Sequence, residues 1–159
     1  MFIRFLLTVF LLFISASKAH ANSLTVEFDL PSFTTSDYHK PYVAIWLESK
    51  EENKTLLLWH LTKRKEDKWL VDIRRWWRKV GRYGDTPDAF TGATKGPGSY
   101  KEVFDVGSLS EFKLYIEVVR EDGGRSLLKQ KINFNDDIAH YSLSADKEIG
   151  EVTITKGNN

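Results

Sequence analysis

The sequence contains no cysteine, and its one methionine is Met1. Without thiols the chain cannot form disulfides, hold an iron–sulfur cluster or attach a c-type haem, so all of that chemistry is excluded. Beyond the first residues it also lacks any apolar stretch near the ~20 residues that a membrane-spanning helix needs. A chain of 159 residues with these absences must be held together by the packing of its core.

The one apolar run stands at the start and is typical of a secretory signal peptide. Arg4 supplies a positive charge, Phe5–Ile14 is almost entirely apolar, and Ala19-His20-Ala21 has the small-x-small pattern that signal peptidase accepts. A transmembrane anchor is the alternative, but the run has only about half the length that a bilayer requires. We therefore predict a signal peptide over residues 1–21, and a single periplasmic or secreted domain over residues 22–159.

The charge of the mature chain gives no reason to expect nucleic acid as a partner. The full sequence has a formal charge of +1, and cleavage after Ala21 would remove two basic residues, Arg4 and Lys18, and no acidic one. A balance this close to neutrality lacks the general basic character of nucleic-acid-binding domains.

Alternation of apolar and polar residues predicts a mainly β domain. The first mature segment alternates cleanly, while the second is apolar on both faces, as expected of a central strand. The predicted strands are Ser23–Leu30, Tyr42–Leu47, Thr55–Leu61, Tyr100–Phe104, Phe112–Arg120, Ser126–Phe134 and Glu148–Thr155. Short connections without a βαβ rhythm favour an antiparallel immunoglobulin-like β-sandwich of about seven strands.

One inserted helix interrupts this pattern, between Asp67 and Gly81. Five apolar residues fall at helical spacing there, with Asp67 as the expected N-cap and Gly81 as the expected stop. These apolar residues are Trp69, Ile73, Trp76, Trp77 and Val80. The same stretch carries basic residues at Arg74, Arg75, Arg78 and Lys79, and Arg82 follows just beyond it.

Three interpretations of this Trp/Arg-rich helix remain open. The tryptophans can cap the open end of the sandwich, with the late cations matching the helix C-terminus. The helix can instead lie on an anionic membrane surface. It can also present Trp76, Trp77 and Arg78 to a flavin or a partner.

The motifs of common hydrolases and nucleotide-binding proteins are absent. The sequence has no Gly-x-Ser-x-Gly, no His-Glu-x-x-His and no phosphate-binding glycine-rich loop followed by Lys-Ser/Thr. The mature histidines, His39, His60 and His140, are too widely spaced for a local metal motif. No catalytic residue and no metal site is predicted.

The stretch from Tyr83 to Ser99 is rich in Gly and Pro, which predicts a loop. Within it lies the segment Asp88-Ala89-Phe90-Thr91-Gly92-Ala93-Thr94. It resembles the D-x-x-S/T-G-A-T sequence of exported FMN-binding domains, including the flavin-carrying subunits of sodium-pumping quinone reductases. The resemblance implies covalent FMN on the Thr94 hydroxyl, attached by an FAD:protein FMN transferase. Within the motif, Asp88 would orient the segment or the transferase's metal, with Thr91, Gly92 and Ala93 completing it. A chance match in a surface loop is the alternative.

A second resemblance covers most of the mature chain. The order PYVAIWLES, KWLVDIRRWWR, DAFTGATKGPGSY and LYIEVVREDGGRSLLKQ resembles the predicted periplasmic proteins of domain-of-unknown-function family 2271. That resemblance implies a small exported β domain linked with flavin transfer and membrane redox systems. Outside the motif the chain does not resemble the usual FMN-binding fold, so no flavin pocket can be carried over.

Two functions follow as hypotheses. The first is an exported flavoprotein that carries FMN on Thr94 and passes electrons to or from a membrane redox partner, without a turnover of its own. The second is a non-catalytic immunoglobulin-like binding or accessory module whose contact surface is the Trp/Arg-rich helix.

Overall fold

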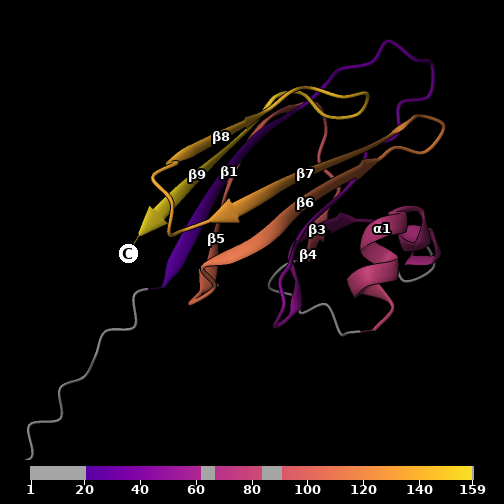
Figure 1. Ribbon diagram of the computed structural model, residues 1–159. Coiled ribbons are helices and arrows are strands. Elements are labelled where there is room, and N and C mark those ends of the chain that lie inside the picture. The colour runs from indigo at the N-terminus through magenta and orange to yellow at the C-terminus, as the bar shows by residue number, and fades with distance from the viewer. Residues whose placement is uncertain (1–20, 62–66, 84–90, 159) are drawn as a thin grey trace, which may run out of the picture.

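Within residues 21–61, 67–83 and 91–158, which the computed structural model describes, nine strands form two facing sheets (Figure 1). One sheet has the strand order β5-β1-β9-β8 and the other β4-β3-β2-β6-β7. The strands are β1 (Asn22–Leu30), β2 (Tyr42–Glu48), β3 (Asn53–His60), β4 (Thr91–Ala93), β5 (Gly98–Gly107), β6 (Glu111–Val119), β7 (Arg125–Asn133), β8 (His140–Leu143) and β9 (Val152–Asn158).

The predicted β-sandwich with one inserted helical segment is confirmed, and each predicted strand is present with shifted ends. Glu148 belongs to the turn before β9, in which Asp146 and Ile149 form an isolated bridge. Sequence patterning missed two short strands, β4 and β8. The predicted loop over Tyr83–Ser99 is therefore wrong in part, because β4 lies within it and β5 begins at its end. Residues 84–90 of that stretch lie outside the described residues.

The main core fills the space between the two sheets. Leu24, Val26, Phe28 and Leu30 of β1 all point into it and are nearly inaccessible, as their alternation predicted. The alternation exists because successive side chains of a strand point to opposite faces of the sheet.

The central strand β2 is buried on both faces, which explains why its sequence is apolar without alternation. Val43, Ile45 and Leu47 contribute to the core between the sheets. Tyr42 and Trp46 point the other way, into a second cluster beneath the helical segment. The remaining buried members of that second cluster are Ala44, Leu58, Ile73, Trp76 and Tyr115.

The helical segment contains three kinds of turn and is not the single α-helix that the spacing predicted. A 3-10 helix (Asp67–Asp72) leads into a short α-helix, α1 (Arg74–Trp76), and then a π-helix (Trp77–Gly81). Ile73 and Trp76 are buried as predicted, but Trp69 is 39% exposed. Four residues of 3-10 helix rotate a side chain by about 120° net, against about 40° in an α-helix, so Trp69 is turned away from the apolar stripe.

The position of this segment also corrects the expectation that it caps the open end of the sandwich. It packs on the outer face of the five-stranded sheet, through the second cluster (Figure 1). Gly81 is the last residue of the π-helix, and a Cβ atom there would lie 2.5 Å from Cζ3 of Trp76. Glycine is needed here because the backbone passes directly over the indole ring. The side chain of Asp67, the predicted N-cap, lies outside the described residues.

Candidate functional site

The second half of the flavinylation-type motif forms an edge strand of the five-stranded sheet. In β4, Thr91 to Ala93 run parallel to Leu58 to His60 of β3. The backbone N–H of the next residue, Thr94, donates to the carbonyl oxygen of His60 at 3.3 Å. Asp88, at the start of the motif, lies outside the described residues. Thr94 therefore stands immediately after a three-residue strand that pairs on one side only.

The two motif threonines differ in their surroundings. Thr94 is partly exposed, and no hydrogen bond joins its hydroxyl to another described residue. Thr91 is also partly exposed, but it is not without an interaction partner. The hydroxyl that the motif assigns as the attachment point is thus outside any strand and has few competing partners within the described chain.

The motif backbone packs against an aromatic cluster formed by Trp59, Tyr100 and Phe28. Trp59, in β3 beside Gly92, is 2% exposed. Its ring lies 5.0 Å from that of Tyr100 in an edge-on arrangement and 5.6 Å from that of Phe28. A Cβ atom on Gly92 would lie 3.5 Å from Cδ1 of Trp59, so the motif backbone passes close over the indole. The Tyr100 hydroxyl donates to the carbonyl oxygen of Gly96 at 2.6 Å and fixes the chain just beyond the motif.

Lys95 places a positive charge next to the candidate attachment residue. Its Nζ atom lies 4.2 Å from the centroid of the Trp59 ring and 5.2 Å from that of Tyr100. The same atom is 3.5 Å from Oε1 of Glu102, and the Lys95 side chain is 44% exposed. Cation–π contact holds the ammonium over the aromatic cluster, and the side chain as a whole is partly exposed.

The three helical residues named as possible flavin or partner contacts differ in accessibility. Trp76 is 1% exposed, and its Nε1 donates to Oγ1 of Thr55 at 3.0 Å, so this ring serves the packing of the segment. Trp77 is half-buried against the second cluster. Arg78 is exposed, and its Nε donates to the carbonyl oxygen of Arg74 at 3.2 Å.

The motif and the groove beside Arg78 lie at opposite ends of β3. The backbone of Thr94 is hydrogen-bonded to His60, the last residue of β3. The groove, in contrast, includes Asn53, the first residue of β3. Strand geometry separates these two ends by roughly 23 Å. The structure therefore presents two distinct candidate surfaces, and it does not bring Arg78 beside Thr94.

A buried carboxylate that sequence reasoning missed holds the helical segment in place. Glu117, on β6, is fully buried and accepts the backbone N–H groups of Arg75 and Trp76 at 3.0 and 2.9 Å. Its Oε1 atom also accepts a hydrogen bond from Nε of Arg125 at 2.7 Å. The only signal in the sequence is a glutamate inside the otherwise apolar run Leu114–Val119. A charge buried in such a run needs partners.

A family model described as "Predicted periplasmic protein (DUF2271)" matches residues 23–151. The chain belongs to this family. The matched range includes both the motif and the helical segment, and it places this DUF2271 protein in the periplasm. No curated protein and no solved structure matches the chain.

Two kinds of feature are absent from the part of this DUF2271 protein that the structure describes. No three His, Asp or Glu side chains gather there in a way that could hold a metal ion. Among the described helices, none has the length and apolar character needed to cross a membrane.

Proposed function

We propose that this periplasmic protein carries FMN covalently on Thr94 and passes electrons between a membrane redox partner and a second acceptor. The observation that supports the proposal most directly is the placement of the Thr94 hydroxyl. It follows an edge strand, is partly exposed and has no hydrogen-bond partner among the described residues. A transferase can engage such an edge without opening the core, because only the β3–β4 pairing must separate.

Attachment would proceed by transfer from FAD. The Thr94 oxygen attacks the phosphorus on the flavin side of the pyrophosphate, a new P–O bond forms, and the P–O bond to AMP breaks. AMP is the leaving group, and the hydroxyl proton passes to a base of the transferase. No electrons are exchanged in this step, so it needs no co-reactant beyond FAD.

The residues around Thr94 suit a phosphodiester at that position. The linkage would carry one negative charge, and the next residue, Lys95, has a partly exposed cationic side chain whose one acidic partner among the described residues is Glu102 at 3.5 Å. Trp59 and Tyr100 hold that ammonium in place and give the attachment point a rigid base. When bound, FMN supplies one- and two-electron transfer, and the protein's contribution is position and local charge.

The test is co-expression of the exported protein with an active FAD:protein FMN transferase, read as in-gel flavin fluorescence. Wild-type protein should become fluorescent, and Thr94→Ser should keep partial labelling because it retains a hydroxyl. Thr94→Ala should lose all labelling while its thermal unfolding stays close to that of wild type. Thr91→Ala is the matched control and should still label. Asp88→Ala should label more slowly, because the acceptor oxygen is retained.

Two results would overturn the proposal. One is a wild-type protein that stays dark beside a transferase that labels a second target in the same cells. The other is full labelling of Thr94→Ala. With either result, the non-catalytic binding module becomes the better account of the protein.

A further inference from the structure

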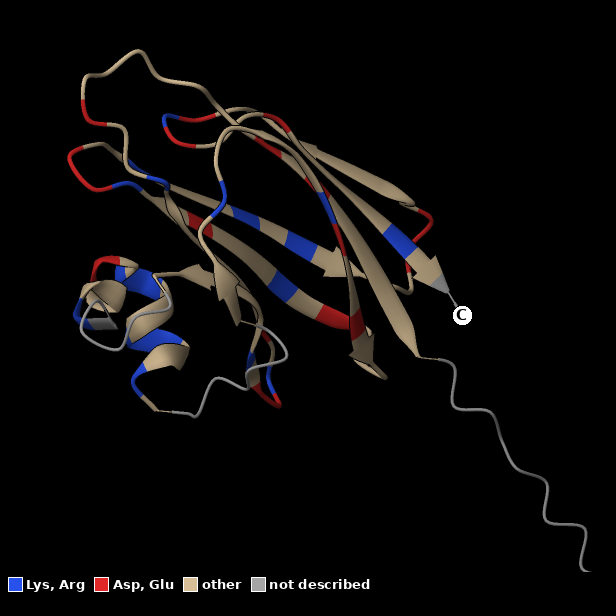
Figure 2. Ribbon diagram, turned by 180° about the vertical axis from the view of Figure 1, so that it is seen from behind, with Lys and Arg blue, Asp and Glu red and all other residues tan. Residues whose placement is uncertain are grey.

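The solvent-facing side of the helical segment is mainly basic, although it includes the partly exposed Asp72. We define the basic face as its five exposed cations: Lys68, Arg74, Arg78, Lys79 and Arg82. None of the five forms an ion pair with an acidic residue in the described part of the chain. Figure 2 shows blue along much of this segment and red at one place in it, whereas basic and acidic positions are interspersed on the sheets.

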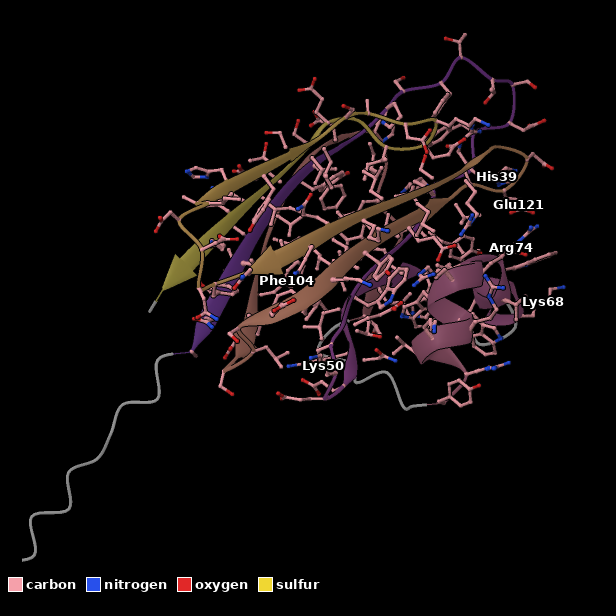
Figure 3. The ribbon with its side chains drawn as sticks, in the orientation of Figure 1. His39, Lys50, Lys68, Arg74, Phe104 and Glu121 are labelled. Atoms are coloured by element: carbon pink, nitrogen blue, oxygen red, sulfur yellow. The ribbon has the colours of Figure 1, made fainter. Side chains whose placement is uncertain are left out.

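The spacing of these cations does not serve the stability of the segment. Arg74, Arg78 and Arg82 follow one another at intervals of four residues, which places like charges one above the other on a helix and destabilises it. Arg74 is in the last turn of α1, but Lys68 lies outside the last turn of the 3-10 helix, so interaction with a helix C-terminus does not account for Lys68. In Figure 3 both side chains point away from the two sheets.

Apolar and aromatic side chains are exposed on the same segment. Trp69, Val71 and Tyr83 are 39%, 47% and 71% exposed, and they are three of the five large hydrophobic residues exposed within the described ranges. Cations accompany both aromatic rings: Nζ of Lys68 lies 4.7 Å from the Trp69 centroid, and Cζ of Arg82 lies 4.5 Å from the Tyr83 centroid.

A groove of about 770 Å³ opens along the basic face. It is lined by Asn53, Arg75, Arg78, Lys79, Arg82 and Tyr83. Arg75 is already paired with Glu48 at 3.0 Å, but the other three cations remain available to an anion. A groove of this size and charge can admit phosphate groups of a lipid surface.

We propose that the basic face, with Trp69, Val71 and Tyr83, docks the protein onto an anionic phospholipid bilayer. Cations combined with exposed Trp, Tyr and aliphatic side chains are typical of helices that lie in the membrane interface. An acidic protein would explain the cations but not the three exposed apolar groups among them. The inference does not depend on the flavin. If the flavin is present, the groove beside Arg78 lies at the opposite end of β3 from Thr94.

The test is co-sedimentation of the protein, purified from the periplasm without flavin, with vesicles of phosphatidylcholine alone or mixed equally with phosphatidylglycerol. We expect binding only to the mixed vesicles, weakening as salt is raised. Each cation removed should weaken binding roughly fivefold. The affinity of the triple variant Arg74→Gln, Arg78→Gln, Arg82→Gln should therefore fall roughly a hundredfold. Trp69→Ser with Tyr83→Ser should weaken the binding that persists at high salt.

The matched control removes three exposed cations elsewhere, by Lys101→Gln, Lys129→Gln and Lys147→Gln. It has the same net charge as the arginine triple variant and should bind nearly as wild type does. Equal losses in the two triple variants would overturn the proposal, since binding would then follow net charge alone. So would a wild-type protein that ignores phosphatidylglycerol vesicles but is retained on polyglutamate, which would assign the face to an acidic protein. Unchanged thermal unfolding of both triple variants excludes misfolding as the cause.

Discussion

At the scale of single residues, Trp76 connects the helical segment to the sheet beneath it. Its ring is 1% exposed, its indole N–H reaches the hydroxyl of Thr55, and Gly81 closes over it. Trp69 belongs to the same segment and differs from it chiefly in exposure. Replacing each tryptophan in turn therefore shows how much of the stability comes from burying the Trp76 ring, because Trp69 is a tryptophan of the same segment that is only partly buried.

Trp76→Ala should lower the free energy of unfolding by about 3–5 kcal/mol, because it empties a fully buried aromatic site. Trp69→Ala should cost about 1 kcal/mol or less, since a large part of that ring is already in water. Urea denaturation of the two variants and of wild type gives both differences. Similar losses in both variants would show that Trp76 is not a packing residue of the second cluster.

Asp136 gives a prediction with a defined pH dependence. Its Oδ1 atom accepts a hydrogen bond from Nζ of Lys156 at 2.6 Å, and this bond lowers the pKa of the carboxyl group below its ordinary value. The stabilisation is complete above the unfolded pKa of about 3.9 and is lost as the pH falls through the lower folded value. Asp136→Asn removes this contribution at every pH.

The difference in unfolding free energy between wild type and Asp136→Asn should therefore shrink on acidification from about pH 5 to about pH 2. Denaturant titrations over that pH range measure it. A difference that stays constant or grows as the pH falls would contradict the role assigned to the ion pair with Lys156.

At the scale of elements, the helical segment is fixed by a residue of the sheet. Glu117 of β6 accepts two backbone N–H groups at the start of α1 and the side chain of Arg125 from β7. This places a fixed negative charge at the beginning of the helix, where it interacts favourably with the helix dipole. The contact is between residues about forty positions apart, so no local pattern could have indicated it.

Glu117→Gln should destabilise the protein by about 3–5 kcal/mol, because it leaves Arg125 without its charged partner and weakens the anchor of α1. Glu111→Gln is the matched control, since Glu111 pairs with Lys131 on the surface and its side chain is 57% exposed. The control should change stability little. Chemical denaturation compares them, and a Glu117→Gln variant as stable as the control would contradict the anchoring role.

The sequence predicted those elements whose residues show a local pattern of apolar and polar positions, and it missed those that depend on contacts between distant residues. β1 and β2 followed from alternation and from burial on both faces. β4 was missed because a three-residue parallel edge strand has no periodicity to detect. The turn types of the helical segment were missed because the contacts that select them, including Glu117 and the close pass of Gly81 over Trp76, come from tertiary packing.

At the scale of the whole molecule, β3 separates two surfaces of different chemistry. Sequence alone located both, one through a motif and one through a run of tryptophan and arginine. It could not place Lys95 over Trp59, because that contact joins residues far apart in the chain. Nor could it show that the groove beside Arg78 and the Thr94 site lie at opposite ends of one strand. The arrangement allows membrane docking and flavin attachment to operate without competing for the same residues.

The most direct test of the central claim is the mass and position of a flavin adduct on the exported protein. Wild-type protein from cells with an active FAD:protein FMN transferase should gain the mass of one FMN, less one water. Peptide mapping should place the added mass on Thr94. An unmodified protein beside a labelled second target, or an adduct on any other residue, would contradict the account.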